Sequence, residues 1–324
     1  MSDSAPVAVG VDFGGTSIKL GVCRGADLLE VDEPIPTQGH DGPVALIRVI
    51  ADRIAKLQER HPEICAVGVG VPGLVDFDNG FVHVLTNVPG WKEVPLKKIL
   101  CEMTGLPTVV ENDANAMAYA EWRYGAGQGL RNVVALTLGT GVGGGLILNN
   151  ELYRGSQFSA GEIGQMSVHY QGVHGHYGNL GALEKYVGNN QIAEYAVKVF
   201  AQAGFGKTVA DCTPRAIAEA AQAGDSVAIQ IWHDIAEWLG TALASVAWLL
   251  NPDAFVIGGG VAQAGPLLFE PLQKKMQSML STVVWEGLKI LPAKFSNEAG
   301  IIGNAALAGD SVPDSVPEPR SSRS

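Results

Sequence analysis

Two stretches of the chain share one pattern, in which a strand-like apolar run leads through a glycine-rich turn into a second strand-like run. They read VGVDFGGTSIKLGV near the N-terminus and VALTLGTGVGGGLIL near the middle. Glycines let the backbone approach a ligand closely and present N–H donors without side-chain obstruction. Two such turns facing each other could hold a polyphosphate, although a tight structural turn would use the same residues. The first turn runs into a strand, whereas Walker A loops and dinucleotide fingerprints open a helix, so it is neither motif.

The remaining segments alternate between strand and helix patterns, which predicts an α/β protein. ADLLEVDEPIP would complete a three-strand meander, and ICAVGVGVPG is a buried strand ended by Pro72 and Gly73. TVVEN and AFVIGGG are further strands. We expect helices at about 42–61, 95–104, 113–124, 188–204, 213–222, 226–250 and after Gly265, followed by a final run, GIIGNAALAG.

Composition excludes several classes of protein. A chain of 324 residues with 47% hydrophobic content can bury the cores of two medium domains. It contains no apolar run of about 20 residues and no basic leader, so we expect a cytoplasmic protein without a membrane partner. The net charge of −11, without a basic run, disfavours nucleic acid. The four cysteines, Cys23, Cys65, Cys101 and Cys212, lack CxxC spacing and should be reduced.

Asp12 stands at the end of the first strand, directly before the glycines and Thr16. Magnesium prefers oxygen ligands, keeps part of its water shell and commonly bridges substrate phosphates. We therefore expect Asp12 to hold Mg²⁺ through water.

Several motifs in order resemble the ROK family of sugar kinases over residues 7–308. They are VDFGGTSIKLGV, VGVPGLVD, NVPGW, ENDANAMAYAE, LGTGVGGGLILNNELYRG, AGEIG and VIGGG. The resemblance implies an actin-like ATPase (ribonuclease H-like) fold, two α/β domains around a cleft, which accounts for the two similar halves. We expect a homodimer. The predicted small domain is 1–117 plus about 300–310, the large domain 118–299, and the disordered tail 311–324.

The resemblance also implies the nucleotide site. Both glycine turns would surround the ATP phosphates, and the glycines of VIGGG would lie near the adenosine. The residues assigned to ATP and magnesium are Asp12, Gly14, Gly15, Thr16, Lys19, Gly139, Thr140, Gly141, Gly258 and Gly259.

Asp113 would be the catalytic base by the same resemblance. Phosphoryl transfer to a sugar needs an acceptor for the hydroxyl proton, and Asp113 follows a buried strand and opens a helix. A helix cap is the alternative role, but a cap does not explain the polar cluster at the end of this strand, where α/β sheets usually place ligands. The cluster is Glu111, Asn112, Asp113 and Asn115.

The stretch GEIGQMSVHYQGVHGHYGNLGALEKY, from Gly161 to Tyr186, could be a metal site or a pocket wall. The ROK family usually has GEIGH and a cysteine-rich segment here, which bind structural zinc through one histidine and three cysteines. This chain has Gln165, Gly175, Tyr177 and Ala182 at those places, so the usual zinc site cannot form. His169, His174 and His176 supply at most three ligands. We expect a hydrogen-bonded loop packed by Tyr170, His176 and Tyr177.

Glucose, phosphorylated at its 6-hydroxyl by ATP, is the predicted substrate. Glu162 and Glu184 match glutamates that bind sugar hydroxyls in the family, and the rest of the predicted sugar site is Gly73, Asn87, Asn112 and Asp113. A loop-turn role is the alternative for Asn87. Other candidate functions are an N-acetylhexosamine kinase and a non-catalytic sugar-sensing regulator, although the first strand, near residue 7, leaves no room for a helix-turn-helix domain. Polyphosphate is a weaker donor candidate because the chain is acidic.

Overall fold

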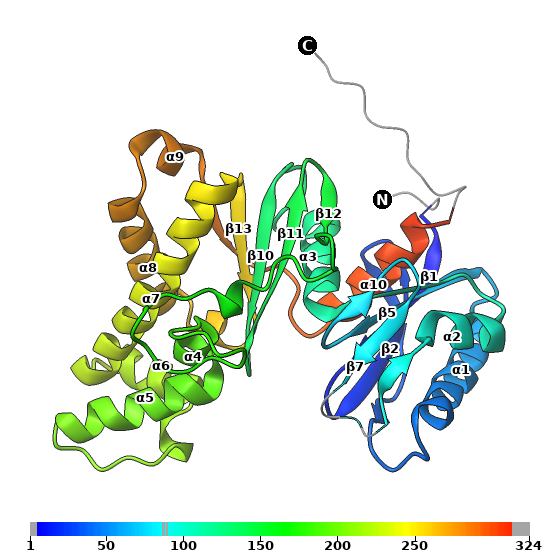
Figure 1. The fold of residues 1–324 in the computed structure, drawn as a ribbon, viewed down its shortest axis with the longest axis horizontal. Helices are drawn as coiled ribbons and strands as arrows, with labels where there is room; N and C mark the ends of the chain where they lie inside the picture. The colour runs from blue at the N-terminus through cyan, green and yellow to red at the C-terminus, as the bar shows by residue number, and fades with distance from the viewer. Residues whose placement is uncertain (1–4, 86–87, 89, 313–324) are drawn as a thin grey trace. The chain divides into compact units, whose positions relative to one another are not determined.

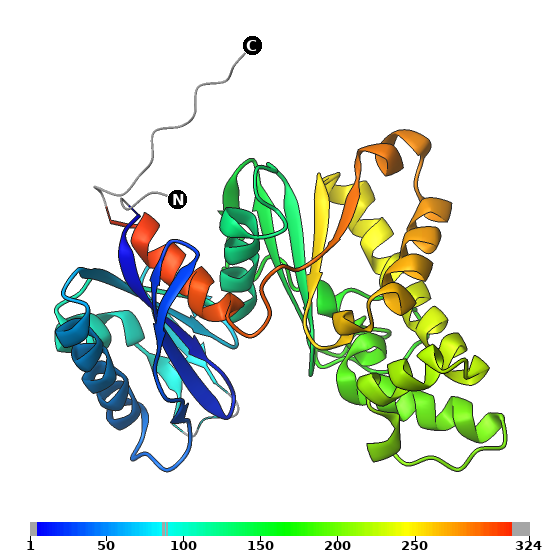
Figure 2. The same ribbon diagram turned by 180° about the vertical axis from the view of Figure 1, so that it is seen from behind.

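The computed structural model describes residues 5–85, 88 and 90–312 of the chain. It divides into two compact units, which are drawn in Figures 1 and 2. One contains the described parts of Met1–Tyr124, Gly155–Ser159 and Asn297–Ser324, and the other contains Gly125–Arg154 and Ala160–Ser296. The predicted tail lies outside the described residues except for Ser311 and Val312, and so does Asn87.

The sheet of the first unit is an antiparallel meander that two parallel strands continue (Figure 1). Its order is β3-β2-β1-β5-β9, with a short β4 beside β2. Neighbouring strands are antiparallel from β3 to β1 and parallel from β1 to β9. The strands are β1 (Val7–Phe13), β2 (Ser17–Arg24), β3 (Asp27–Val31), β4 (Ile35–Pro36), β5 (Ile64–Val71) and β9 (Thr108–Asn112).

Helices cover both faces of this sheet, as Figures 1 and 2 show, with α1 (Pro43–Arg60) and α2 (Leu96–Thr104) on one face. The other face carries α3 (Asp113–Tyr124) and α10 (Ala299–Asp310). Successive strand residues point to opposite faces, so Val9 and Val11 join the core with α1 while Gly10 meets α10. A side chain at Gly10 would collide with the carbonyl of Ile301, and α10 can therefore lie directly on β1.

The second unit repeats the first sheet's order and strand directions. Its strands follow the order β12-β11-β10-β13-β14, with antiparallel pairing from β12 to β10 and parallel pairing from β10 to β14. The predicted similarity of the two halves is therefore confirmed. The strands are β10 (Val133–Leu138), β11 (Val142–Leu148), β12 (Glu151–Tyr153), β13 (Ala254–Gly258) and β14 (Lys289–Pro292).

A long helix with one buried face, α7 (Ser226–Leu250), packs into the core of the second unit. The Asp225 carboxylate caps it by accepting the N–H groups of Val227 and Ala228 at 2.8 and 3.1 Å. No helix in the described part of the chain is long and apolar enough to cross a membrane. The other helices of this unit are α4 (Glu184–Val187), α5 (Asn189–Gln202), α6 (Pro214–Gln222), α8 (Pro266–Met279) and α9 (Thr282–Gly287).

The expected strands and long helices are confirmed, and the differences are at short elements. GIIGNAALAG, which was given no type, lies in α10 despite its glycines, because Gly303 lets the helix approach the Ala116 carbonyl of α3. Strand β14 was missed, as was a small sheet of β6 (Val75–Asp76), β7 (Phe81–Val84) and β8 (Lys92–Val94). These strands have two to four residues, too few for a periodic pattern.

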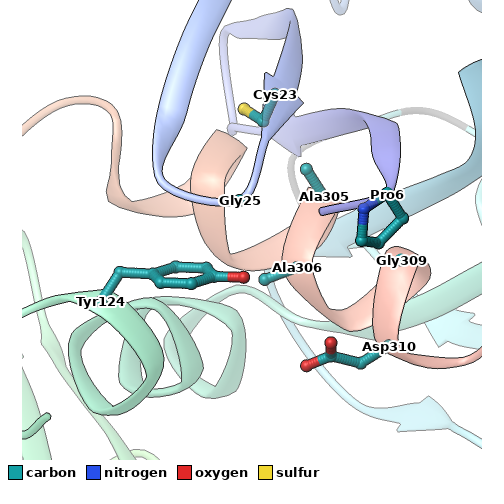
Figure 3. A pocket seen from close by; sticks show the side chains of 8 residues that line it. All are labelled: Pro6, Cys23, Gly25, Tyr124, Ala305, Ala306, Gly309 and Asp310. Carbon is teal, nitrogen blue, oxygen red and sulfur yellow. The ribbon is translucent and has the colours of Figure 1, made fainter. Parts of the chain in front are cut away.

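Asp310 joins the ends of α3 and α10. Its carboxylate accepts the Tyr119 hydroxyl at 2.6 Å and the Arg123 guanidinium at 2.8 and 3.0 Å. Figure 3 shows Asp310, Tyr124 and Cys23 around a small cavity of about 10 Å³, which is close to the space that one water needs. Burial raises the pKa of the Cys23 thiol to about 12, so this cysteine is protonated and unreactive at neutral pH.

Candidate active site

Three of the predicted site residues, Asp12, Gly73 and Asn112, lie where the three parallel strands of the first unit end. Asp12 of β1 is aligned with Gly70 of β5, and Val71 of β5 is aligned with Asn112 of β9. Gly73 follows β5 and accepts a hydrogen bond from Asn112 Nδ2 at 3.1 Å. The carboxyl edge of this sheet therefore gathers residues that are about 100 positions apart in the sequence.

Asp12 pairs with Lys19 across the β1–β2 hairpin. Burial raises the pKa of the Asp12 carboxyl, and the positive charge of Lys19 opposes this shift. Within residues 5–85, 88 and 90–312, no group of three or more His, Cys, Asp or Glu side chains is arranged to hold a metal. Asp12 offers a carboxylate at this edge, which suits magnesium because the ion prefers oxygen ligands, keeps water ligands and binds substrate phosphates.

The turn between β1 and β2 is held by its own backbone and by Thr37. Gly14 N–H donates to the Ser17 carbonyl at 3.0 Å. The buried Thr37 donates through Oγ1 to the Gly15 carbonyl at 3.0 Å and through its N–H to the Thr16 carbonyl at 3.1 Å. Thr37 was not among the predicted site residues; its signal in the sequence would be a polar residue directly after the short strand β4. These three hydrogen bonds fix the backbone of the turn.

Asn112, and not Asp113, supplies the main cap of α3. Its Oδ1 accepts the N–H groups of Ala114 and Asn115 at 3.0 and 3.1 Å. Asp113 is the first helical residue, and its Oδ1 accepts the Ala114 N–H at 2.8 Å. The capping role that was the alternative for Asp113 thus belongs chiefly to its neighbour.

Glu111 holds the residues of this cap in place through hydrogen bonds. The residue is 2% exposed, and its Oε1 accepts the Asn112 N–H at 2.9 Å and Asn115 Nδ2 at 3.0 Å. A carboxylate that accepts two hydrogen bonds fixes both neighbours strongly. Glu111 therefore sets the direction in which Asp113 leaves the strand.

The second glycine turn, Gly139 to Gly141, joins β10 to β11 as predicted. Gly139 N–H donates to the Gly141 carbonyl at 2.9 Å. Gly259 follows β13 with φ of 87° and lies against the backbone of Leu138, where a side chain would collide. The glycines after β13 are consequently packed beside the turn, at the carboxyl ends of two parallel strands.

Glu162 and Glu184 lie within electrostatic range of each other in the second unit. Partial burial and the charge of Glu184 both raise the pKa of Glu162, with burial the larger cause. Glu184 is the first residue of α4, and its Oε2 accepts the Val142 N–H at 3.1 Å. Two carboxylates within electrostatic range of each other can both accept hydrogen bonds from a polyhydroxylated ligand.

Hydrogen bonds hold the loop between these glutamates. Asn179 Nδ2 donates to the Gln165 carbonyl at 2.8 Å, and Gly175 N–H donates to the Asn179 carbonyl at 2.7 Å. The predicted packing by tyrosines is wrong, since Tyr170 and Tyr177 are 79% and 81% exposed. Small residues such as Gly175 leave the loop interior to the Asn179 side chain, so the tyrosines have no room inside.

Of the three histidines in this loop, His176 reaches a predicted site residue. Its Nε2 lies 3.2 Å from Glu184 Oε1 and 3.1 Å from Lys185 Nζ. His174 forms a β-bridge with Leu180, and the His169 ring contacts Tyr170. The three histidines therefore each contact a different residue.

A pocket of about 270 Å³ opens beside Gly260, close to the lower end of the range of about 300–1,000 Å³ for small-molecule sites. The residues predicted from the sequence in this region are only the glycines Gly258 and Gly259. The other lining residues come from α6, α7 and the turn after β13, whose proximity the sequence does not reveal. They are Pro214, Arg215, Ala218, Glu219, Gln222, Trp232, Val261, Gln263 and Ala264.

Comparison with known proteins places these features in one family. The model of the ROK family matches residues 8–311. A glucokinase of Halalkalibacterium halodurans is 36% identical over 310 residues, which are 92% of this chain and 94% of that protein. The crystal structure of a ROK family glucokinase from Streptomyces griseus, in complex with glucose and AMPPNP, is 35% identical with a TM-score of 0.76. The match covers 93% of this chain and 99% of the Streptomyces griseus chain.

A second solved structure, a ROK hexokinase from Thermus thermophilus, is 33% identical with a TM-score of 0.81. It covers 95% of this chain and 99% of its own. The predicted actin-like fold is thereby confirmed.

Proposed function

The chain belongs to the ROK family and is a sugar kinase, and we propose that it transfers the γ-phosphoryl group of Mg-ATP to the 6-hydroxyl of glucose. The observation that carries the proposal is the arrangement at the start of α3. Asn112 caps the helix and Glu111 fixes Asn112, so Asp113 is held at the carboxyl edge of the sheet without being the main cap. The Asp113 carboxylate therefore lies at the carboxyl ends of the parallel strands, where α/β sheets usually place ligands.

In the proposed reaction Asp113 accepts the proton of the sugar hydroxyl. As the hydroxyl oxygen bonds to the γ-phosphorus, the bond from phosphorus to the β–γ bridging oxygen breaks and ADP leaves. Positioned bases of this kind contribute about 10² to 10⁴-fold to rates. Magnesium, when bound near Asp12, would supply neutralisation of phosphate charge. The cap geometry orients Asp113, because the Asn112 amide joins the helix to the Gly73 carbonyl.

Glucose is proposed to bind through carboxylates and amides. By the family resemblance, Glu162 and Glu184 would accept hydrogen bonds from sugar hydroxyls, and Gly73, Asn87 and Asn112 are assigned to the same sugar. An amide nitrogen has two donor hydrogens, so Asn112 Nδ2 can bind both Gly73 and a ligand. The glucose bound by the Streptomyces griseus relative supports this choice of sugar.

ATP is the proposed phosphoryl donor because the second unit contains both a glycine-rich turn that could bind phosphate and the pocket beside Gly260. Backbone N–H groups at Gly14 to Thr16 and Gly139 to Gly141 would bind the phosphates. The pocket beside Gly260 would take the adenine, with buried Trp232 and Val261 as apolar walls. A polyphosphate donor would have no use for such a pocket. The AMPPNP held by the same relative also supports a nucleotide donor.

An N-acetylhexosamine kinase is the second candidate. Gln165 stands where relatives carry a histidine, and its Oε1 is buried without a protein partner among the described residues. That acceptor could bind the N–H of an acetamido group, which glucose lacks.

We also propose a homodimer, which light scattering coupled to size-exclusion chromatography would test.

The test is a coupled assay for ADP release with Mg-ATP and a panel of sugars. We expect the highest kcat/KM for glucose, and we expect glucose 6-phosphate as the product. A higher kcat/KM for N-acetylglucosamine or N-acetylmannosamine than for glucose would favour the second candidate function, an N-acetylhexosamine kinase. No sugar phosphate from glucose, mannose, glucosamine or their N-acetyl forms would refute the proposed hexokinase activity.

A further inference from the structure

The carboxylate of Glu184 has two different neighbours. Oε2 accepts the N–H of Val142, the first residue of β11, which directly follows the turn Gly139 to Gly141. Oε1 lies 3.2 Å from His176 Nε2, on the loop that leads back to Glu162. The Glu184 side chain is 18% exposed, whereas that of His176 is 61% exposed. The bond to Val142 is therefore the better shielded of the two.

The turn is shaped around this carboxylate. A Cβ at Gly141 would collide with Glu184 Oε2, so only glycine lets the carboxylate sit against the turn. Asn189 N–H, five residues after Glu184, donates to the Gly139 carbonyl at 2.8 Å. A Cβ at Gly188 would lie 2.8 Å from the Thr140 carbonyl oxygen. The segment from Glu184 to Asn189 thus supports the turn at both ends.

The charge of the same carboxylate also acts on Glu162, which is assigned to the sugar. The charge of Glu184 raises the pKa of Glu162, so the two carboxylates interact through space. A ligand hydroxyl that binds Oε1 would compete with the exposed His176 contact and not with the shielded Val142 bond. One side chain would then hold the sugar by one oxygen and the phosphate turn by the other.

We propose that Glu184 couples the two substrates, so that bound sugar strengthens ATP binding and bound ATP strengthens sugar binding. The coupling rests on the proposed function, because it assigns the sugar to Oε1 and the ATP phosphates to the turn. Sugar binding orients the carboxylate, and the oriented carboxylate fixes the Val142 N–H and the turn before it. By thermodynamic linkage each ligand must raise the affinity for the other by the same factor.

The test measures this factor by calorimetry on the wild-type protein. Glucose is titrated with and without AMPPNP and Mg²⁺, and AMPPNP with Mg²⁺ is titrated with and without glucose. We expect the two titrations to give one factor, within the range of about 5 to 150-fold that is usual for coupled sites. In Glu184→Gln we expect it to fall by about threefold or more, because a neutral amide binds Val142 N–H less strongly than a carboxylate does.

Glu162→Gln is the matched control, since Glu162 is assigned to the sugar whereas the Val142 N–H beside the turn binds Glu184. It should weaken glucose binding while the coupling factor stays that of the wild type. Gly141→Ala is the converse test. Its methyl group would push Glu184 from the turn, so glucose affinity measured without nucleotide should fall although residue 141 is assigned to phosphate binding.

A wild-type factor of one, or a Glu184→Gln factor equal to that of the wild type, would overturn the coupling. So would an unchanged glucose affinity in Gly141→Ala. These results are distinct from failure of the proposed function. An enzyme that phosphorylates sugar without coupling refutes the role of Glu184 alone, whereas a wild-type protein that makes no sugar phosphate refutes the proposed function.

Discussion

Asp113→Asn separates catalysis from stability at the start of α3. The amide has nearly the shape of the carboxylate and can still bind a sugar hydroxyl, but it cannot accept the proton. The helix cap stays in place, because Asn112 Oδ1 holds the N–H groups of Ala114 and Asn115. We therefore expect kcat to fall by about 10² to 10⁴-fold, equivalent to about 3 to 5 kcal/mol of activation free energy.

The assay measures kcat and KM for glucose and the melting temperature of one preparation. Asn112→Ala is the comparison, because it removes the cap itself and should cost about 1 kcal/mol of stability. For a chain of this size that corresponds to a melting temperature lower by about 2 to 4 °C. Asp113→Asn should leave the melting temperature close to that of the wild type. Normal turnover with a lowered melting temperature would make Asp113 a structural residue and refute the mechanism.

Three further predictions concern packing, pH and metal. Gly10→Ala should lower the free energy of unfolding by about 1–3 kcal/mol in urea, because its methyl group meets the Ile301 carbonyl; an unchanged midpoint would contradict the packing of α10 on β1. Glu162→Gln should have a higher melting temperature than the wild type at pH 7. The raised pKa of the Glu162 carboxyl makes the wild type lose stability as pH rises above about 4.3, so the difference in melting temperature should vanish near pH 4. A lower melting temperature of the variant at pH 7 would show that the folded protein lowers this pKa. Chelation with EDTA should stop turnover until Mg²⁺ is added and leave the melting temperature unchanged, whereas a large loss of stability would reveal a structural metal.

Most strands of the two large sheets were predictable because strand patterns and glycine turns are local. VGVDFGGTSIKLGV and VALTLGTGVGGGLIL predicted two hairpins, and the structure confirms β1–β2 and β10–β11. The cap of α3 was harder, since ENDAN offers adjacent polar residues and a shift of one position exchanges the cap. Only the hydrogen bonds of Asn112 identify it.

Contacts between distant segments could not be read from the sequence. Asn304 of α10 is 1% exposed, and its Nδ2 donates to the Val11 carbonyl at 3.0 Å, although nothing in GIIGNAALAG marks it for β1. The Val142–Glu184 bond likewise joins residues 42 positions apart. Such contacts follow from tertiary packing, which overrides local patterns.

The most direct test of the central claim is NMR of the products that the wild-type protein forms from glucose and Mg-ATP. We expect glucose 6-phosphate and one ADP for each sugar phosphate. Release of ADP without any phosphorylated sugar, or phosphorylation at another hydroxyl, would contradict the assignment of glucose and its 6-hydroxyl to this site.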